Sequence, residues 1–332
     1  MKEKGLIKYY PPKRLWMILN RNQINIENDK SFSGGWMSIY KPKKITSFSA
    51  LKIIKKKFLL KKIGFAGTLD PLASGVLPLA FGAATKTIPY LVSSKKKYKF
   101  SILWGTKTSS HDLEGEVVDQ SNLRPSKKDI INVIKKFDGD ILQRPPKFSA
   151  IKVNGKRAYN LARNQEYFTL QKKRVKIHNI SLINHNNILS TFIVTCGKGF
   201  YIRALARDIC HELGVLGTVN TLERLEVGPF SIENTFSLET IVNLVHSAPA
   251  GTVGENLLTP LSKVLDDIPA LQIGDKEAER FQQGQIIFDY DLSSSSSLGS
   301  KVMLLNNDRP IGLADICENS FKPKKVFSEE IF

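Results

Sequence analysis

The chain has 332 residues, of which 42% are hydrophobic and 24% are charged. This composition is typical of folded globular proteins and excludes wholesale disorder, and the length is sufficient for two domains of ordinary size. Lys and Arg number 49 against 31 Asp and Glu, which gives a formal net charge of +18. The longest weakly polar run, residues 75–84, contains Pro78 and is much shorter than the roughly 20 apolar residues of a membrane-spanning helix.

The N-terminus and the cysteines both predict a cytoplasmic protein. The first residues lack the compact apolar core and cleavage site of a signal peptide. The three cysteines, Cys196, Cys210 and Cys317, are odd in number and widely spaced, which favours reduced thiols over a disulfide framework or a zinc finger.

The positive charge is concentrated in the first two hundred residues. Residues 1–100 contain 21 basic and 4 acidic side chains, residues 101–200 contain 17 and 8, and residues 201–332 contain 11 and 19, so the balances are +17, +9 and −8. Such a distribution predicts a polyanionic partner such as nucleic acid. Biased codon usage would produce a similar composition, so charge alone does not establish binding.

The pattern of the N-terminal third predicts an extension, a strand and a basic helix. Residues 1–30 show no clear period, and we interpret them as an N-terminal extension with partial disorder. Residues 36–40 predict a strand that ends at Lys41-Pro42, because proline cannot donate to a sheet. A helix follows with Thr46 or Ser47 as its cap, and its predicted apolar stripe consists of Phe48, Leu51, Ile54 and Phe58.

The middle of the chain mixes strands and helices irregularly. The Gly- and Pro-rich residues 64–82 predict mostly loop or strand end, residues 97–104 alternate as a half-buried strand does, and Asn154-Gly155 predicts a type I′ hairpin. Residues 192–196 predict another strand, which leads into a helix that carries Leu205, Ile209 and Leu213 and ends at Gly214. This order favours an α+β fold over a doubly wound sheet.

A second, smaller unit is expected from about Leu257. Four short strand-like segments, 270–273, 285–288, 301–305 and 310–314, are separated by turns and by a serine-rich loop at residues 293–297. We therefore expect a larger domain over residues 31–250 and a small β-barrel over residues 257–332.

Common cofactor motifs are missing, and three residues remain as candidates for chemistry. The chain has no P-loop, Rossmann glycine fingerprint or HExxH motif, and its five histidines lack metal-ligand spacing, so no metal site is predicted. Asp70 lies in the glycine-rich stretch and could act as a nucleophile or general base, although capping a turn or neutralising a lysine is favoured from the residues alone. Arg203 could bind a carboxylate bidentately or form a surface salt bridge. Tyr98 is either a core tyrosine or a stacking platform for a base.

Residues 64–75, Gly-Phe-Ala-Gly-Thr-Leu-Asp-Pro-Leu-Ala-Ser-Gly, resemble the signature loop of the TruB family, the bacterial tRNA pseudouridine-55 synthases. Further matches occur in the same order over residues 35–236: Gly35-Trp36, Lys41-Pro42, Ile45-Thr46-Ser47, Gly82, Ala84-Thr85-Lys86, Lys97-Tyr98, Gln143-Arg144-Pro145-Pro146, Ser149-Ala150-Ile151-Lys152, Gly155, Lys198-Gly199, Tyr201-Ile202-Arg203, Leu205, Asp208, Leu213-Gly214 and Gly228-Pro229-Phe230. So many ordered matches make a chance resemblance implausible.

The resemblance implies an α+β pseudouridine-synthase domain with a mixed sheet and flanking helices, followed by a small PUA-like RNA-binding barrel. It implies that Asp70 is catalytic and that no metal or organic cofactor takes part. The substrate-binding residues that it implies are Tyr98, which stacks on the target base, Arg203, which pairs with the catalytic carboxylate, and Tyr201, Leu222, Phe65 and Lys41.

The implied reaction is the isomerisation of uridine 55 to pseudouridine in the T-loop of tRNA. The flipped uridine loses its N1–C1′ bond and is rejoined through C5, after the carboxylate attacks C1′ or removes the C2′ proton. The implied partner is the T-arm of tRNA, and we expect a monomer without an obligatory protein partner.

The chain departs from the family pattern at two places. Phe65 replaces a histidine that helps to hold the target loop open, and Glu223-Arg224 replaces a pair of arginines near the expected RNA path. Two alternative functions remain open: the catalytic subunit of a guide-RNA particle, and a non-catalytic RNA-binding or chaperone protein, which would need the basic face but not Asp70.

Overall fold

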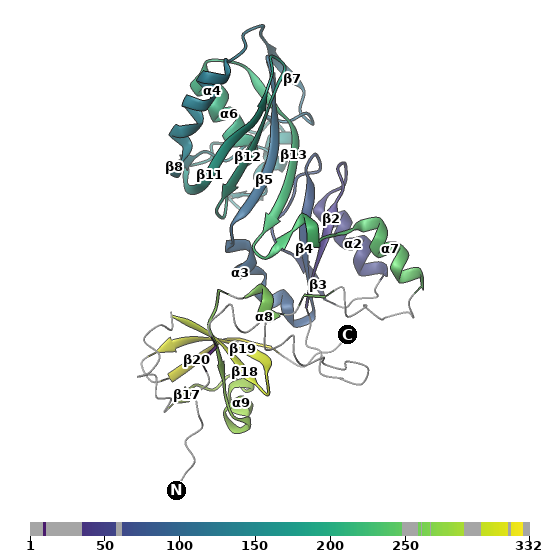
Figure 1. The fold of residues 1–332 in the computed structure, drawn as a ribbon, viewed down its shortest axis with the longest axis vertical. Helices are drawn as coiled ribbons and strands as arrows, with labels where there is room; N and C mark the ends of the chain where they lie inside the picture. Colours follow the sequence, from purple (N-terminus) through teal and green to yellow (C-terminus); the bar gives the residue numbers. More distant parts are fainter. Residues whose placement is uncertain are drawn as a thin grey trace.

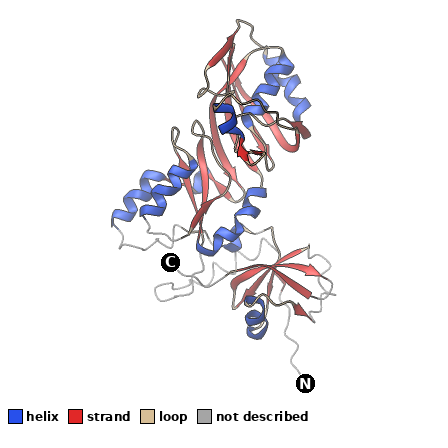
Figure 2. Cartoon of the chain, turned by 180° about the vertical axis from the view of Figure 1, so that it is seen from behind, coloured by secondary structure: helices blue, strands red, loops and turns tan. Residues whose placement is uncertain are grey.

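The computed structural model describes residues 9–10, 35–57, 62–247, 258–259, 261–265, 267–288, 300–317 and 320–327. The molecule is elongated, with a large sheet along most of its length and a smaller unit at one end (Figure 1). Seen from behind, the same large sheet carries helices at both of its ends (Figure 2). The predicted α+β architecture with a small C-terminal barrel-like unit is confirmed.

The large sheet is mixed, because β4 and β13 pair in parallel, as do β2 and β15, whereas the other neighbours are antiparallel. Its order is β15 (Phe236–Ser237), β2 (Trp36–Lys41), β4 (Ser74–Phe81), β13 (Gly217–Val227), β5 (Lys96–Trp104), β12 (Leu189–Cys196), β11 (Lys173–His185) and β8 (Gly139–Gln143). Two short strands, β3 (Ile63–Phe65) and β14 (Phe230–Ser231), pair with β4 and β13. The hairpin β6 (Thr106–Thr108) and β7 (Val117–Gln120) forms a separate ribbon.

Helices cover the sheet at its two ends (Figure 1). One end packs α4 (Lys127–Ile134), η3 (Lys135–Phe137) and α6 (Ile202–Leu213) over a core that includes Phe100, Phe192 and Leu205. At the other end, α2 (Ser47–Lys57) and α7 (Leu238–Ser247) pack near β2 and β3. The remaining helical segments are η2 (Gly82–Thr87), α3 (Ile88–Ser93), α5 (Ala158–Arg163) and η4 (Ile232–Asn234).

The glycine-rich stretch is more regular than its sequence predicted. All eight residues of β4 are buried, so the strand has no apolar–polar alternation by which to recognise it. Pro78 is accommodated because β4 pairs with β13 at Ser74 and Gly75 but with β3 only from Leu79 onward. The prediction of loop was therefore wrong for residues 74–81 and holds for the segment between β3 and β4 that contains Asp70.

The helix α2 begins as predicted but buries a different face. The Thr46 hydroxyl accepts a hydrogen bond from the Ser49 amide at 2.9 Å, which is an N-cap contact. Ala50, Leu51 and Ile54 are buried, whereas Phe48 is 57% exposed. Phe48 was therefore wrongly assigned to the apolar stripe, and Phe58 lies outside the described residues.

Two turn predictions are confirmed by the backbone. Asn154 and Gly155 both have positive φ, 48° and 82°, as a type I′ turn requires, and they join β9 (Lys152–Val153) to β10 (Lys156–Arg157). Gly214 ends α6 in the left-handed conformation with φ 66°.

The C-terminal unit is a six-stranded curled sheet. Its order is β1 (Tyr9–Tyr10), β16 (Ala270–Gln272), β18 (Lys301–Asn306), β19 (Arg309–Cys317), β20 (Ser320–Val326) and β17 (Ile287–Phe288), with α8 (Leu261–Val264) and α9 (Asp275–Gln282) beside it. Of the predicted N-terminal extension, only Tyr9–Tyr10 is described, and this segment adds a strand to the unit by pairing with β16. The predicted loop at residues 293–297 lies outside the described residues.

The C-terminal unit shares a hydrophobic cluster with the large domain. Trp36, Leu91 and Phe230 of the large domain belong to the same buried cluster as Met303 and Leu313. Two contacts join η2 and α3 to the unit: Lys86 donates to the carbonyl of Val326, and the Lys301 ammonium lies 5.6 Å from the centre of the Tyr90 ring. The two parts therefore share a buried apolar contact, and the division into domains at residues 31–250 and 257–332 stays a prediction.

Candidate active site

Asp70 projects from a loop that the preceding helix holds in place. The Ser47 hydroxyl, at the start of α2, accepts from the Leu69 amide at 2.8 Å and donates to the Leu69 carbonyl at 3.1 Å. The Lys44 amide also donates to the Pro71 carbonyl at 2.8 Å. Both neighbours of Asp70 are thus fixed, while its own side chain remains 35% exposed.

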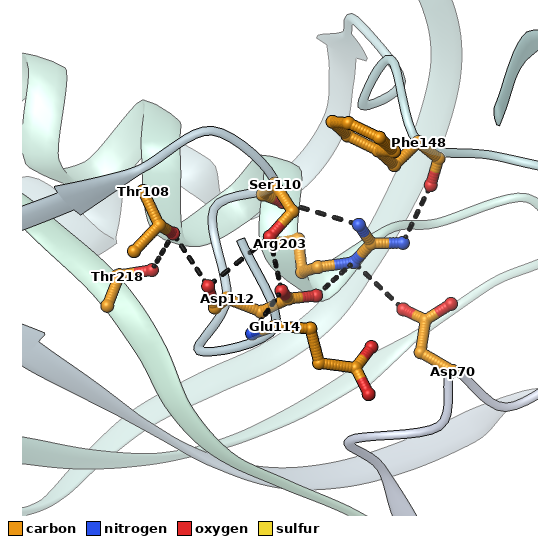
Figure 3. Close-up of polar contacts among 8 residues, drawn as sticks. All are labelled: Asp70, Thr108, Ser110, Asp112, Glu114, Phe148, Arg203 and Thr218. Carbon is orange, nitrogen blue, oxygen red and sulfur yellow. Dashed lines mark hydrogen bonds and ion pairs between the residues drawn. The ribbon is translucent and has the colours of Figure 1, made fainter. Parts of the chain in front are cut away.

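Arg203 lies in the first turn of α6 and contacts Asp70 directly (Figure 3). Its Nε donates to Asp70 Oδ2 at 2.8 Å, and its Nη2 donates to the Phe148 carbonyl at 2.9 Å. A longer contact of 3.3 Å joins Nη1 to the Ser110 carbonyl. The guanidinium is therefore oriented by three separate segments, and a surface salt bridge, the alternative for Arg203, is excluded because its side chain is only 5% exposed.

Asp112 is a second carboxylate on Arg203, which the sequence did not reveal. Its Oδ2 lies 3.4 Å from Arg203 Nε, and its side chain is 2% exposed. Asp112 Oδ1 accepts from the Ser110 hydroxyl and from the Glu114 amide, the latter at 3.1 Å. No local motif marks a buried carboxylate in a loop, so only the packing of this loop on α6 identifies it.

The loop that carries Asp112 is anchored to β13. The Thr108 hydroxyl donates to the Asp112 carbonyl at 2.6 Å and lies 2.7 Å from the Thr218 hydroxyl (Figure 3). Asp112 forms a parallel bridge with Val219. These contacts fix the loop that carries Asp112 relative to the large sheet.

His111 lies in the same loop with a positive φ of 61°. Burial, together with the positive charges of Arg207, Lys107 and Arg203, lowers the pKa of its imidazole to about 4, and the negative charge of Asp112 opposes this effect only in part. His111 is thus a neutral imidazole at physiological pH.

The three predicted pocket residues lie on elements that meet near Asp70. Tyr98 of β5 is 8% exposed, Leu222 of β13 is 5% exposed, and Tyr201 precedes α6. Burial is the main cause that raises the pKa of both the Tyr98 and the Tyr201 hydroxyl, and the negative charge of Asp70 adds to each effect. The Gln143 amide group holds the Tyr201 backbone through contacts of 2.9 and 3.1 Å.

Lys41 is completely buried, and its ammonium faces the main chain. Its Nζ donates to the carbonyls of Pro42 and Ile45 at 2.9 and 2.8 Å. Burial lowers its pKa to about 8, against the opposing effect of the Asp70 carboxylate. These contacts shape the turn beside the Asp70 loop, and a role for Lys41 in substrate binding stays a prediction.

Phe65 is half-buried in β3, where it pairs with Leu79 and packs against the cluster formed by β2, β4 and α2. Arg224, which the sequence placed near the RNA path, is only 1% exposed. Its guanidinium instead donates to the carbonyls of Val76 and Gly67 at 2.8 and 2.9 Å, and therefore supports the base of the Asp70 loop. The neighbouring Glu223 accepts a hydrogen bond from the Tyr40 hydroxyl at 2.7 Å.

Two further features bear on the class of protein. Among the residues that the structure describes, His, Cys, Asp and Glu side chains form no group of three or more that could hold a metal ion. The described helices include none that is long and apolar enough to cross a membrane.

Comparison with known proteins places this geometry in a family. Residues 55–202 match the model of the TruB family pseudouridylate synthase N-terminal domain. The chain is 40% identical over 300 residues to a tRNA pseudouridine synthase B of Caulobacter sp. (strain K31), covering 88% of this chain and 96% of the relative. It is 38% identical over 305 residues to the protein of the same name from Bradyrhizobium diazoefficiens, covering 91% and 88%.

Solved structures support the fold. A chain from the crystal structure of a Cbf5-Nop10-Gar1 complex superimposes with a TM-score of 0.69 at 23% identity, covering 98% of this chain and 91% of that one. A chain from an H/ACA RNP bound to a substrate RNA containing 2′-deoxyuridine gives a TM-score of 0.68 at 21% identity, with coverage of 96% and 90%. The identity and coverage of the sequence relatives, together with the loop that carries Asp70, show that this chain belongs to the TruB family of pseudouridylate synthases.

Proposed function

We propose that this protein converts uridine 55 of tRNA to pseudouridine, with Asp70 as the catalytic residue. The observation that carries the proposal is the Asp70–Arg203 contact of 2.8 Å, made on the loop whose sequence resembles the TruB signature. The relatives that cover most of the chain are named tRNA pseudouridine synthase B, which supports tRNA as the substrate.

The geometry suits a reaction through an electron-poor sugar. Cleavage of the N1–C1′ bond gives the ribose oxocarbenium character, which a nearby carboxylate stabilises. Asp70 is sufficiently exposed to meet a ribose, while Arg203 holds one of its oxygens and orients the other. Attack on C1′ and removal of the C2′ proton both remain compatible with this arrangement.

The surrounding residues suit a flipped nucleotide. The uracil must be reached from all sides, so the nucleotide has to leave its stack before it can react. Tyr98 and Tyr201 lie close enough to Asp70 for its charge to raise their pKa values, and Tyr98 and Leu222 belong to the buried cluster that also contains Leu69. We infer that these residues receive the uracil.

The charge distribution supports an RNA substrate. Residues 35–69 contain nine lysines and no acidic residue, and Asp70 is the first carboxylate after that stretch. Lys52, Lys55 and Lys56 are exposed on α2, whose first residue holds the Asp70 loop. A phosphate backbone that passes the active site could therefore meet these ammonium groups.

Several further expectations stay predictions. They are the division into domains at residues 31–250 and 257–332, action on the T-arm without a metal or organic cofactor, the monomeric state, independence from a protein partner, and the cytoplasmic location.

The test uses purified protein alone with an unmodified tRNA transcript whose uracils carry a C5 label. We expect label release and a single pseudouridine at position 55, and we expect Asp70→Asn to abolish both while tRNA affinity stays within a few-fold. A transcript with cytidine at position 55 is the matched substrate control. Turnover that requires an added guide RNA would favour the particle subunit, and binding without label release would favour a non-catalytic RNA-binding protein.

A further inference from the structure

Glu114 presents a third carboxylate at the active site. Figure 3 shows its side chain extending beside Asp70, on the same side of Arg203. The residue is exposed, and within the described part of the chain its carboxylate forms no hydrogen bond or ion pair. By contrast, both Asp70 and Asp112 are bound to Arg203. Of the three carboxylates, Glu114 is thus the one that Arg203 does not bind, so both of its oxygens remain available to a ligand.

The position of Glu114 is fixed by its backbone. Its amide donates to Asp112 Oδ1 at 3.1 Å, and the next amide, of Gly115, donates to the Asp112 carbonyl at 3.3 Å. A side chain at Gly115 would meet Ser110 atoms at 2.4 to 2.6 Å, so the turn is tightly packed there. A side chain on such an anchored turn is held near Asp70 in a way that a residue on a loose surface loop is not.

The surroundings of Glu114 make it a stronger base than a glutamate in water. Partial burial raises the pKa of its carboxyl, and the negative charges of Asp112 and Asp70 raise it further, whereas the positive charges of Arg203 and Lys41 oppose this effect. A carboxylate with a raised pKa is a stronger proton acceptor than one of ordinary pKa, and it remains ionised above that pKa.

The reaction leaves one proton transfer without an assigned residue. When the detached uracil bonds to C1′ through C5, that carbon carries both the new bond and its original hydrogen, and the ring has a double bond between N1 and C6. Loss of the C5 proton returns the electron pair of the C5–H bond to the ring as the C5–C6 double bond, and N1 takes a proton from water. Both routes for Asp70 pass through this species, so a base is required in either case.

We propose that Glu114 is the base that removes the C5 proton after the uracil has been reattached. The protonated Glu114 then returns its proton to water, so the enzyme is unchanged at the end of the turnover. The inference rests on the proposed isomerisation, since it assigns one step within it.

The test compares Glu114→Gln and Glu114→Asp with a control, Glu116→Gln, which changes an exposed carboxylate two residues further along the same segment. Single-turnover rates are measured on transcripts that carry hydrogen or deuterium at uracil C5, together with tRNA affinity and melting temperature. Loss of a general base costs about 10²–10⁴-fold in rate. We expect Glu114→Gln to lose activity in this range with unchanged affinity and melting, to show a larger deuterium effect than wild type, and to be partly rescued by aspartate.

The pH profile gives an independent readout. The wild-type rate should fall as pH decreases through the pKa of Glu114, and Glu114→Gln should lack that limb. Equal rates and equal isotope effects for wild type and Glu114→Gln would overturn the inference, as would equal losses in the Glu116→Gln control. If the wild-type protein itself forms no pseudouridine, the proposed function fails instead, so the two failures are distinguishable.

Discussion

Replacing Arg203 with methionine should reduce both stability and activity, but for different reasons. Arg203 joins Asp70, whose side chain is 35% exposed, to the buried Asp112, whose side chain is 2% exposed. Removing one member of a buried ion pair costs about 3–5 kcal/mol, because the remaining charge has no compensation. The exposed member contributes much less, since solvent screens its charge. We therefore expect the free energy of unfolding to decrease by about 3–5 kcal/mol, almost entirely through Asp112.

A second substitution separates the two effects. In the double variant that carries both Arg203→Met and Asp112→Asn, the buried charge is removed together with its partner, so a substantial part of the lost stability should return. The coupling free energy between contacting residues of this kind is about 0.5–3 kcal/mol. Activity should not return, because Asp70 still lacks the guanidinium that orients it. Stability and activity would thus be uncoupled in one pair of variants.

The assay combines urea unfolding at pH 7 with single-turnover pseudouridine formation at a temperature where every variant is folded. Asp112→Asn alone completes the cycle. The reasoning is refuted if the double variant is as unstable as Arg203→Met, since the buried Asp112 charge would then not be the cause. Recovery of activity together with stability would equally refute it, because Arg203 would then act only by supporting the fold.

Three other predictions follow from burial and charge. Phe65→Ala should destabilise by about 1–3 kcal/mol, less than truncation of a fully buried phenylalanine, because its ring is half-buried against the β2–β4 cluster; a loss of tRNA affinity with unchanged melting would instead indicate an RNA contact. His111 has a pKa of about 4 in the folded protein, below its ordinary 6.5, so the unfolded chain binds the proton more tightly. The free energy of unfolding should therefore decrease by up to about 3 kcal/mol as pH falls from 6.5 to 4. In urea titrations, the free energy of unfolding of His111→Gln should depend less on pH between 4 and 6.5 than that of wild type. Between pH 7 and 8 the two proteins should respond to pH much more alike. Deleting residues 257–332 should lower the melting temperature of the remaining protein, reduce kcat and raise KM, because Trp36 and Phe230 lose part of their buried cluster. An unchanged kcat and melting temperature would show that the two units are independent.

Local patterns in the sequence determined much of the scaffold. Asn154-Gly155 predicted its hairpin because few residue pairs accept positive φ at both central positions of a turn. The alternating residues of β5 and the glycine that ends α6 were recognisable for similarly local reasons. Asp70, Arg203 and Tyr98 were identified as candidates, and the family resemblance gave them roles that the residues alone left open.

The tertiary structure decided which side chains meet. The eight buried residues of β4 lack alternation because both faces of the strand are covered, so its sequence resembles a loop. Asp112 joins Arg203 across 91 positions of the chain, and Glu114 lies beside Asp70 because the turn after Ser110 is anchored to β13. Arg224 looks like a surface cation in the sequence, yet it is buried against the carbonyls of Gly67 and Val76. The spacing of apolar residues along a helix or strand indicates which of its faces is buried. Contacts between distant segments depend instead on how whole elements pack, and no local sequence pattern predicts those contacts.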